Sequence, residues 1–397
     1  MSDDPSRKTA LARVGSTLVG KWHVDRLLDV GGMAAVFVAT HRNGKRVAIK
    51  LLHAEFAQNE DVRARFLREG YVANKVGHPG AVEVLDDDTL DDGGVFLVME
   101  LLEGESLDAR LRRAGVLTPV ECFFLADRLL DVLAAAHQKQ IVHRDIKPAN
   151  VFITQAGEIK LLDFGLARVR EATVDAKTRD GIVLGTAAYM PPEQARAKTD
   201  LVDARSDLWA VGALMFTALS NHYVHDAPTA IDRMVATMKR PARSVTTVVP
   251  TLPAAAVQVI DTALRFEKDQ RYPNAKAMQL ETRRVFAELA RAQAPMVQMT
   301  AAATQVVVIE RAPAESSPIA RSIAVALDGL DASLESLAIE VAIESEPPPV
   351  SQRPTMADPV AVAALVANEP KAAPAPRPTT AVKAPVAPPR PRPTTKK

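Results

Sequence analysis

The stretch that decides the fold is His143-Arg144-Asp145-Ile146-Lys147-Pro148-Ala149-Asn150. It follows the apolar pair Ile141-Val142 and places a carboxylate, an amine and a carboxamide within six residues. The carboxylate can accept a proton, the amine can neutralise phosphate charge, and the carboxamide can bind a metal ion. A generic polar loop is the ordinary alternative, but this spacing favours a catalytic loop.

A second element follows downstream, where Asp163-Phe164-Gly165 comes directly after the apolar run Ile159-Lys160-Leu161-Leu162. A carboxylate at the end of a strand, followed by glycine, suits Mg²⁺ binding beside a mobile loop. The tripeptide alone is common, so its position after the first element is what makes it informative.

Two further elements lie upstream. The first, Asp29 to Val36, contains Gly31-Gly32 between two strand-like runs, and small residues there let backbone amides approach phosphates closely. On its own it is more simply explained as a hairpin turn. The second is Val47-Ala48-Ile49-Lys50, a lysine that ends an apolar strand. Its ordinary explanation is a snorkelling side chain, but Glu69 in the next predicted helix, around 61–75, is a natural ion partner.

In this fixed order the four elements resemble the signature of protein kinases. The resemblance covers residues 20–290 and is closest to the bacterial Hanks-type (eukaryotic-like) serine/threonine protein kinases, which often show Gly-Gly-Met in the nucleotide loop. It implies an α+β, bilobal fold with a small β-rich N-lobe at about 20–102 and a larger helical C-lobe at about 103–290. The strand-like runs before residue 103 and the helical pattern after it agree with that division.

The resemblance implies transfer of the ATP γ-phosphoryl group to protein serine and threonine hydroxyls. The expected cofactors are ATP and Mg²⁺, with Mn²⁺ as a substitute, and the expected partners are protein substrates. Lysine at position 147 marks the serine/threonine class. The residues that the resemblance assigns are Asp145 and Lys147 for catalysis; Val30, Gly31, Val36, Lys50, Glu69, Met99, Glu100 and Leu102 for ATP; and Asn150 and Asp163 for the metal.

Later landmarks carry structural expectations from the same resemblance. Glu193, in Met190-Pro191-Pro192-Glu193, should pair with Arg271, and Asp207 should brace the catalytic loop. Arg144 and Arg168 are expected to bind a phosphate on the loop between them and Met190. We predict Thr178, and second Thr173, as the autophosphorylation sites; Thr186 is expected to be a structural contact.

The nucleotide loop departs from the family pattern, because Asp29 and Ala34 stand where glycines are usual. A carboxylate near ATP would repel its phosphates, so weaker ATP affinity is expected. Two alternatives stay open: a pseudokinase scaffold with an impaired nucleotide loop, and a signalling protein whose tail is the interacting part.

The composition of the chain also bears on nucleic-acid binding, disulfide bonds and membrane insertion. The 397 residues carry a net charge of +1, which gives no overall field for nucleic acid. The single cysteine, Cys122, rules out a disulfide framework within the chain and is expected to be buried. Neither a signal peptide nor a run of ~18 apolar residues is evident, so a cytoplasmic protein without a membrane span is expected.

The region 291–397 is expected to be a low-complexity, largely disordered tail, because half of the 28 prolines lie beyond Ser345. One apolar seam, spaced alternately by four and three, predicts an amphipathic helix at 321–343. Its members are Ile323, Leu327, Leu330, Leu334, Leu337 and Val341. The seam and the proline-rich end, Pro388 to Pro393, suggest association with a partner or with a second copy. The ordinary alternative, a tail that only adds solubility, stays open.

Overall fold

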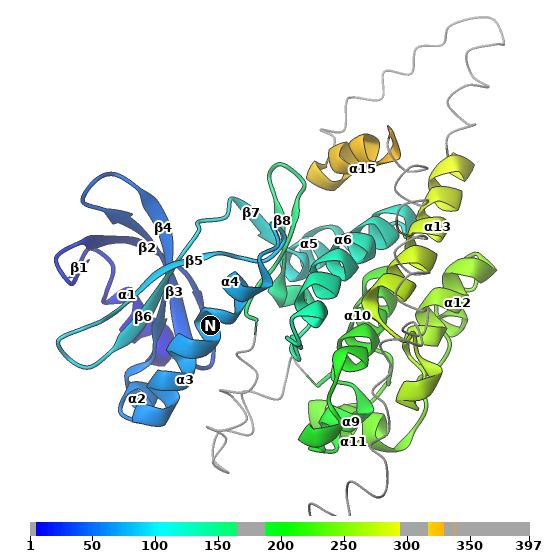
Figure 1. Ribbon diagram of the computed structural model, residues 1–397, viewed down its shortest axis with the longest axis horizontal. Coiled ribbons are helices and arrows are strands. Elements are labelled where there is room, and N and C mark those ends of the chain that lie inside the picture. The colour runs from blue at the N-terminus through cyan, green and yellow to red at the C-terminus, as the bar shows by residue number, and fades with distance from the viewer. Residues whose placement is uncertain (1–4, 165–186, 294–316, 329–336, 338–397) are drawn as a thin grey trace, which may run out of the picture. The chain divides into compact units, whose positions relative to one another are not determined.

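The N-lobe of the computed structural model is an antiparallel sheet with helices around it (Figure 1). The structure describes residues 5–164, 187–293 and 317–328, together with Leu337. The strand order is β1-β2-β3-β4-β6-β5. The N-lobe elements are α1 (Pro5–Leu11), β1 (Thr17–Leu18), β2 (Trp22–Val30), β3 (Ala34–His41), β4 (Arg46–Leu52), α2 (Ala54–Ala57), α3 (Glu60–Gly70), α4 (Val72–Val76), β5 (Val84–Thr89) and β6 (Val95–Met99).

The N-lobe extends further toward the N-terminus than the predicted start at residue 20. Helix α1 packs on β2 and buries Ala10, and β1 pairs with β2. The predicted hairpin at Asn43-Gly44 is confirmed, because β3 and β4 pair across it and Gly44 has φ +88°. The predicted helix at 61–75 is divided into α3 and α4 around Tyr71.

The C-lobe is mainly helical and carries one small sheet of order β7-β8-β9 (Figure 1). Its elements are β7 (Gly104–Ser106), α5 (Leu107–Ala114), α6 (Pro119–Gln138), β8 (Val151–Thr154), β9 (Ile159–Leu161), α9 (Pro192–Ala195), α10 (Ala204–Ser220), α11 (Ala230–Lys239), α12 (Ala254–Ala263), α13 (Ala275–Gln293) and α15 (Pro318–Asp328), with 3₁₀ turns at Pro148–Asn150, Thr199–Leu201, Val245–Thr247 and Lys268–Gln270.

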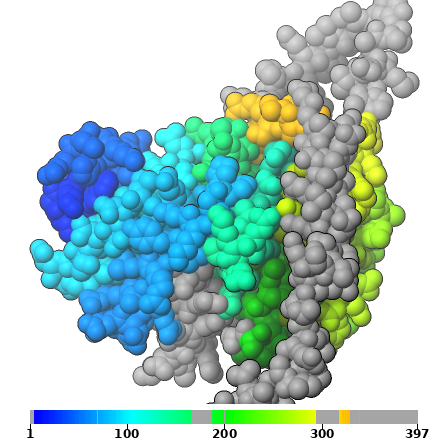
Figure 2. All heavy atoms as spheres, in the orientation of Figure 1, coloured from blue at the N-terminus to red at the C-terminus, as the bar shows by residue number. Residues whose placement is uncertain are grey.

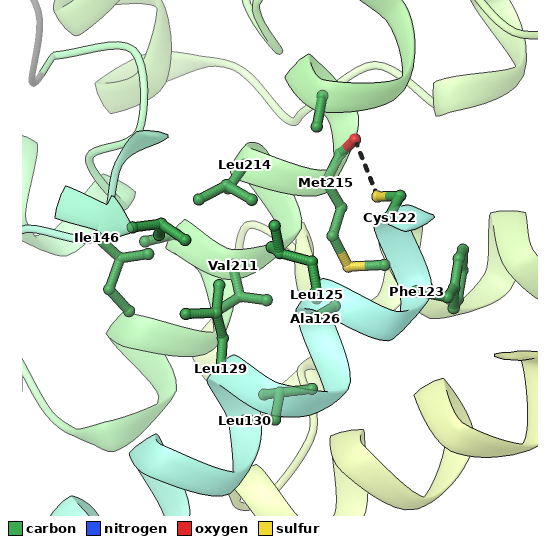
Figure 3. Packing of buried hydrophobic residues seen from close by; sticks show 14 of the residues in the cluster. Cys122, Phe123, Leu125, Ala126, Leu129, Leu130, Ile146, Val211, Leu214 and Met215 are labelled. Atoms are coloured by element: carbon green, nitrogen blue, oxygen red, sulfur yellow. Dashed lines mark hydrogen bonds between the residues drawn. The ribbon is translucent and has the colours of Figure 1, made fainter. Parts of the chain in front are cut away.

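Helix α6 is the central helix of the C-lobe core. Its start is set by a capping box, in which the Thr118 hydroxyl accepts from the Glu121 amide and the Glu121 carboxylate accepts from the Thr118 amide. Such a cap contributes about 1 kcal/mol. Apolar side chains of α6 meet those of α10 together with Ile146 from the catalytic loop (Figure 3). The core of the lobe therefore anchors the loop that carries Asp145.

Cys122 lies in this core with no exposed surface, as predicted, and its thiol donates to the Met215 carbonyl at 3.8 Å (Figure 3). Burial raises the pKa of the Cys122 thiol, so it stays protonated and unreactive.

The described part of the tail is helical rather than extended. Helix α15 begins at Pro318, three residues before the predicted start at 321, and ends at Asp328 in the described range. Figure 2 shows it, in orange, against green atoms of the C-lobe. The remainder of the predicted seam, apart from Leu337, and the proline-rich end lie outside the described residues. Among the described helices, none combines the length and apolar composition that would cross a membrane.

Candidate active site

The catalytic loop brings the side chains of Asp145, Lys147 and Asn150 together. Lys147 Nζ donates to both carboxylate oxygens of Asp145, at 3.1 and 2.9 Å. Asn150 Nδ2 donates to the Asp145 carbonyl at 2.7 Å and to its Oδ2 at 3.1 Å. Asp145 is 3% exposed. The predicted base, the predicted phosphate-neutralising lysine and the predicted metal ligand therefore form one cluster, in which Asp145 and Asn150 are buried and Lys147 is partly exposed.

The ring of His143 holds this loop, a role that the sequence alone did not suggest. His143 has no exposed surface. Its Nε2 lies 2.8 Å from the Leu162 carbonyl and its Nδ1 lies 3.2 Å from the Asp145 amide. A neutral ring protonated at Nε2 satisfies both contacts, because a carbonyl accepts and an amide donates. His143 thereby joins the catalytic loop to the residue that precedes Asp163.

Asp207 braces the catalytic loop through hydrogen bonds to its backbone, as predicted. Its carboxylate accepts from the amides of His143 and Arg144, each at 2.9 Å, and from His137 Nε2 at 2.8 Å. Burial alone would raise the pKa of Asp207, but the hydrogen bond and charge of His137, with the hydrogen bond from the Arg144 amide, hold it below its ordinary value. Asp207 is thus an anion that fixes Arg144 in a left-handed conformation, with φ +68°.

The two predicted metal ligands flank the β8–β9 hairpin. Asn150 directly precedes β8, and Asp163 follows β9 after one residue. The Leu162 amide donates to the Asn150 carbonyl at 2.9 Å, so the two ends of the hairpin are bonded together. Oxygen donors of this kind suit Mg²⁺. Asp163 has φ +61°, an uncommon conformation that a residue at a ligand site can retain.

Lys50 reaches from the N-lobe sheet to this pair. It lies in β4 opposite Val36 of β3 and Leu97 of β6, and it is 9% exposed. Its Nζ lies 2.5 Å from Asp163 Oδ1. The predicted partner, Glu69, belongs to α3, but its side chain lies outside the described part of the chain, so that pair stays a prediction.

Three of the remaining predicted ATP residues lie at the end of β6 and in the connection that follows it. Met99 ends β6 opposite Ala48 of β4. The Glu100 amide donates to the Glu83 carbonyl at 3.0 Å, so Glu100 would hold an adenine edge through its own carbonyl. The Glu100 carboxylate accepts from Lys160 Nζ at 2.9 Å. Leu102 follows in the connection to β7.

The nucleotide loop is a tight turn between β2 and β3. The Gly31 amide donates to the Ala34 carbonyl at 2.9 Å, and Val30 pairs with Ala35. Asp29 is exposed, and its Oδ1 accepts from the Val30 amide at 2.9 Å.

His53 also contacts this turn and was missed by sequence reasoning. Its Nε2 lies 2.9 Å from the Gly31 carbonyl, and its amide donates to the Met33 carbonyl at 2.8 Å. A histidine three residues after Lys50 carries no signal in a single sequence.

The predicted Glu193–Arg271 pair is confirmed as a buried, two-pronged ion pair. The Arg271 guanidinium donates to both Glu193 oxygens, each at 2.9 Å, and Ser206 donates to the same carboxylate at 2.6 Å. Gln194 next to it donates to the Arg144 carbonyl at 3.0 Å. The segment from Met190 to Gln194 is therefore bonded to the catalytic loop. The predicted regulatory residues Arg168, Thr173 and Thr178, with Thr186, lie outside the described residues.

Comparisons with known proteins agree with this geometry. The family model "Protein kinase domain" matches residues 22–281. A probable serine/threonine-protein kinase PknB of Corynebacterium glutamicum is 33% identical over 269 residues, which are 66% of this chain and 41% of that protein. Serine/threonine-protein kinase PrkC of Bacillus subtilis is 32% identical over 274 residues, which are 69% of this chain and 42% of that protein.

A solved structure, the PknI kinase domain of Mycobacterium tuberculosis, aligns with a TM-score of 0.53 and 25% identity over 68% of this chain and 98% of that one. The chain spans about two fifths of the length of the two curated relatives. On the family match and these relatives, the chain belongs to the protein kinase family, among the bacterial Hanks-type serine/threonine kinases.

Proposed function

We propose that this protein transfers the γ-phosphoryl group of ATP to serine and threonine hydroxyls of proteins. The observation that carries the proposal is the hydrogen-bonded cluster of Asp145, Lys147 and Asn150, which is bonded to the hairpin that leads to Asp163. Phosphoryl transfer needs positioned charges more than covalent chemistry from the protein, and this cluster supplies them.

Each residue then has a distinct task. Asp145 orients the acceptor hydroxyl and takes its proton. Lys147 and Lys50 place positive charge beside the phosphates. Asn150 and Asp163 would hold Mg²⁺, which neutralises charge that develops on the phosphate oxygens. Mn²⁺ accepts the same oxygen ligands, so it should support the reaction as well.

The pseudokinase alternative requires a failure of nucleotide binding or of transfer. Asp29 was the reason for considering this alternative. Its carboxylate is exposed and accepts a hydrogen bond from the Val30 amide. An exposed charge acts weakly on phosphates in water. The intact Lys50–Asp163 contact favours the enzyme.

Transfer of radiolabel from [γ-³²P]ATP to a generic acceptor protein tests the proposal. The full chain should label serine and threonine in the presence of Mg²⁺ or Mn²⁺, and chelation should stop it. Labelled tyrosine alone, or ATP binding without transfer by a folded protein, would contradict the proposal.

We further propose that the enzyme is regulated by autophosphorylation of Thr178 or Thr173, and that Arg144 and Arg168 bind the resulting phosphate. A phosphate between guanidinium groups gains charge-assisted hydrogen bonds. Mass spectrometry after incubation with ATP and Mg²⁺ should find phosphate on one of the two threonines, and replacing both with alanine should lower activity. Full activity of an unphosphorylated enzyme would refute this. The cytoplasmic location, and association through the tail, stay predictions.

A further inference from the structure

Helix α15 buries one face against the C-lobe. Ile319 is 1% exposed and belongs to the main hydrophobic cluster, and Ile323 and Ala326 pack against the same cluster. These positions recur every three to four residues and so share one side of the helix. Val325 lies on the other side and is 75% exposed. The helix therefore has a defined inner face, directed at α6 and β8.

Polar contacts join α15 to the turn between β8 and β9. Arg321 Nη2 donates to the Gln155 carbonyl and Ser322 Oγ donates to the Ala156 carbonyl, each at 3.2 Å. The close approach depends on Gly157, which has φ +82°. A Cβ atom on Gly157 would lie 2.1 Å from the Pro318 carbonyl oxygen and 2.3 Å from Ser322 Oγ.

The surface beneath α15 has a direct relation to the active site. The β8–β9 hairpin connects Asn150 to Asp163, and its turn is bonded to the connection between the lobes through the Gln155 amide and the Glu103 carbonyl, at 2.8 Å. The start of α15 also forms part of the wall of a pocket of about 340 Å³ together with β7, α5 and β8. Figure 2 shows the orange helix against the green atoms of this region.

We propose that segment 317–328 is a docking segment for its own kinase domain, and that its docking holds the β8–β9 hairpin between the two metal-binding residues. The folded catalytic unit then includes α15 as well as α13, and so extends beyond the family match that stops at residue 281. The proposal concerns the stability of the hairpin, and it does not depend on the acceptor specificity of the enzyme.

Hydrogen–deuterium exchange of the full chain tests this. Ile319→Asp places a charge on the buried face and should undock the helix. Exchange should then rise tenfold or more in α15 and detectably in residues 151–161. Val325→Asp makes the same change on the exposed side of the same helix and should leave both segments as in the wild type.

Two outcomes would overturn the proposal: unchanged exchange in 151–161 after Ile319→Asp, or equal effects of the two variants. If Ile319→Asp does not fold, the double variant Arg321→Ala, Ser322→Ala removes only the two contacts with the turn. That variant should raise exchange in both segments, and wild-type exchange there would refute the proposal. Because exchange is read without ATP, failure of this test is distinguishable from failure of the kinase assay.

Discussion

Lys50 Nζ and Asp163 Oδ1 are 2.5 Å apart, although 113 residues separate them in the chain. One lies in the middle of the N-lobe sheet and the other follows the last strand of the C-lobe hairpin. This contact joins the lysine expected to hold ATP phosphates to the carboxylate expected to hold the metal, and the lysine that makes it is 9% exposed.

Lys50→Met should lower turnover by about 10²–10³-fold, the range found when one charge-stabilising donor is removed from a transition state. The protein should remain folded, because methionine fills a similar volume in β4. Lys45→Met is the matched control, since Lys45 is exposed in the hairpin before the same strand. Steady-state kinetics measures the turnover of both variants, and circular dichroism measures their folding. Equal turnover for the two variants would show that Lys50 does not act in the site.

Asp29→Asn should tighten ATP binding by no more than about fivefold, because an exposed charge interacts by about 1 kcal/mol or less. Asp91→Asn, at an exposed position in the β5–β6 turn, should bind ATP as the wild type does. Calorimetric titration with ATP and Mg²⁺ measures the affinities. A much larger gain at position 29 would mean that its carboxylate faces the phosphates when ATP is bound.

Glu193→Gln should destabilise the protein by about 3–5 kcal/mol, because it leaves Arg271, whose side chain has no exposed surface, without its buried counter-charge. Glu281→Gln removes one partner of the exposed Arg284–Glu281 pair and should change stability by less than about 1 kcal/mol. Denaturant unfolding of both variants checks the contrast. Similar losses for the two would show that the Glu193 pair is not buried in solution.

The ionisation of Glu193 should also make the stability of the fold depend on pH. Burial alone would raise the pKa of Glu193, but Arg271 and Ser206 lower it below the usual 4.5. A carboxylate whose pKa is lower in the folded than in the unfolded state stabilises the fold above pH 4.5, and that stability is lost as the pH falls through the folded pKa. The melting temperature of the wild type should therefore fall more steeply below pH 4.5 than that of Glu193→Gln. Parallel curves would contradict this.

Asp207→Asn should lower both stability and turnover. An amide offers one accepting oxygen, so its NH₂ group would face one of the donors now bound by the carboxylate. The expected loss is about 1–3 kcal/mol, with slower transfer because Arg144 and Asp145 lose their support. Asp200→Asn, an exposed change in a nearby 3₁₀ turn, is the control. Melting curves and initial rates that match between the variants would exclude this role.

The sequence predicted which residues of the catalytic loop meet, because these motif residues lie close together in the chain. Asp145, Lys147 and Asn150 meet within one loop, so local spacing was enough. The pairing of Glu193 with Arg271 and the bracing role of Asp207 came from resemblance to the family, and the structure confirms both. Contacts such as His137 with Asp207, or His53 with Gly31, join distant segments and carry no periodic signal.

Elements that break the usual patterns were missed. Strand β5 contains Asp86, Asp87 and Asp88, which are poor strand formers, but it is the edge strand, where charge prevents further pairing. Tyr71 donates a hydrogen bond to Asp87 and so holds this strand in place.

The tail helix was predicted from an apolar seam, but periodicity gives only the apolar face. It does not say that Ile319 packs against the chain's own C-lobe.

Single-turnover transfer by Asp145→Asn, with ATP affinity measured on the same sample, tests whether Asp145 is the catalytic base. We expect the rate of transfer to fall by ~10²–10⁴-fold, while ATP binding in the presence of Mg²⁺ stays within about twofold, because Asn150, Asp163 and Lys50 are unchanged. A folded Asp145→Asn protein that transfers phosphate at near the wild-type rate would show that Asp145 is not the base.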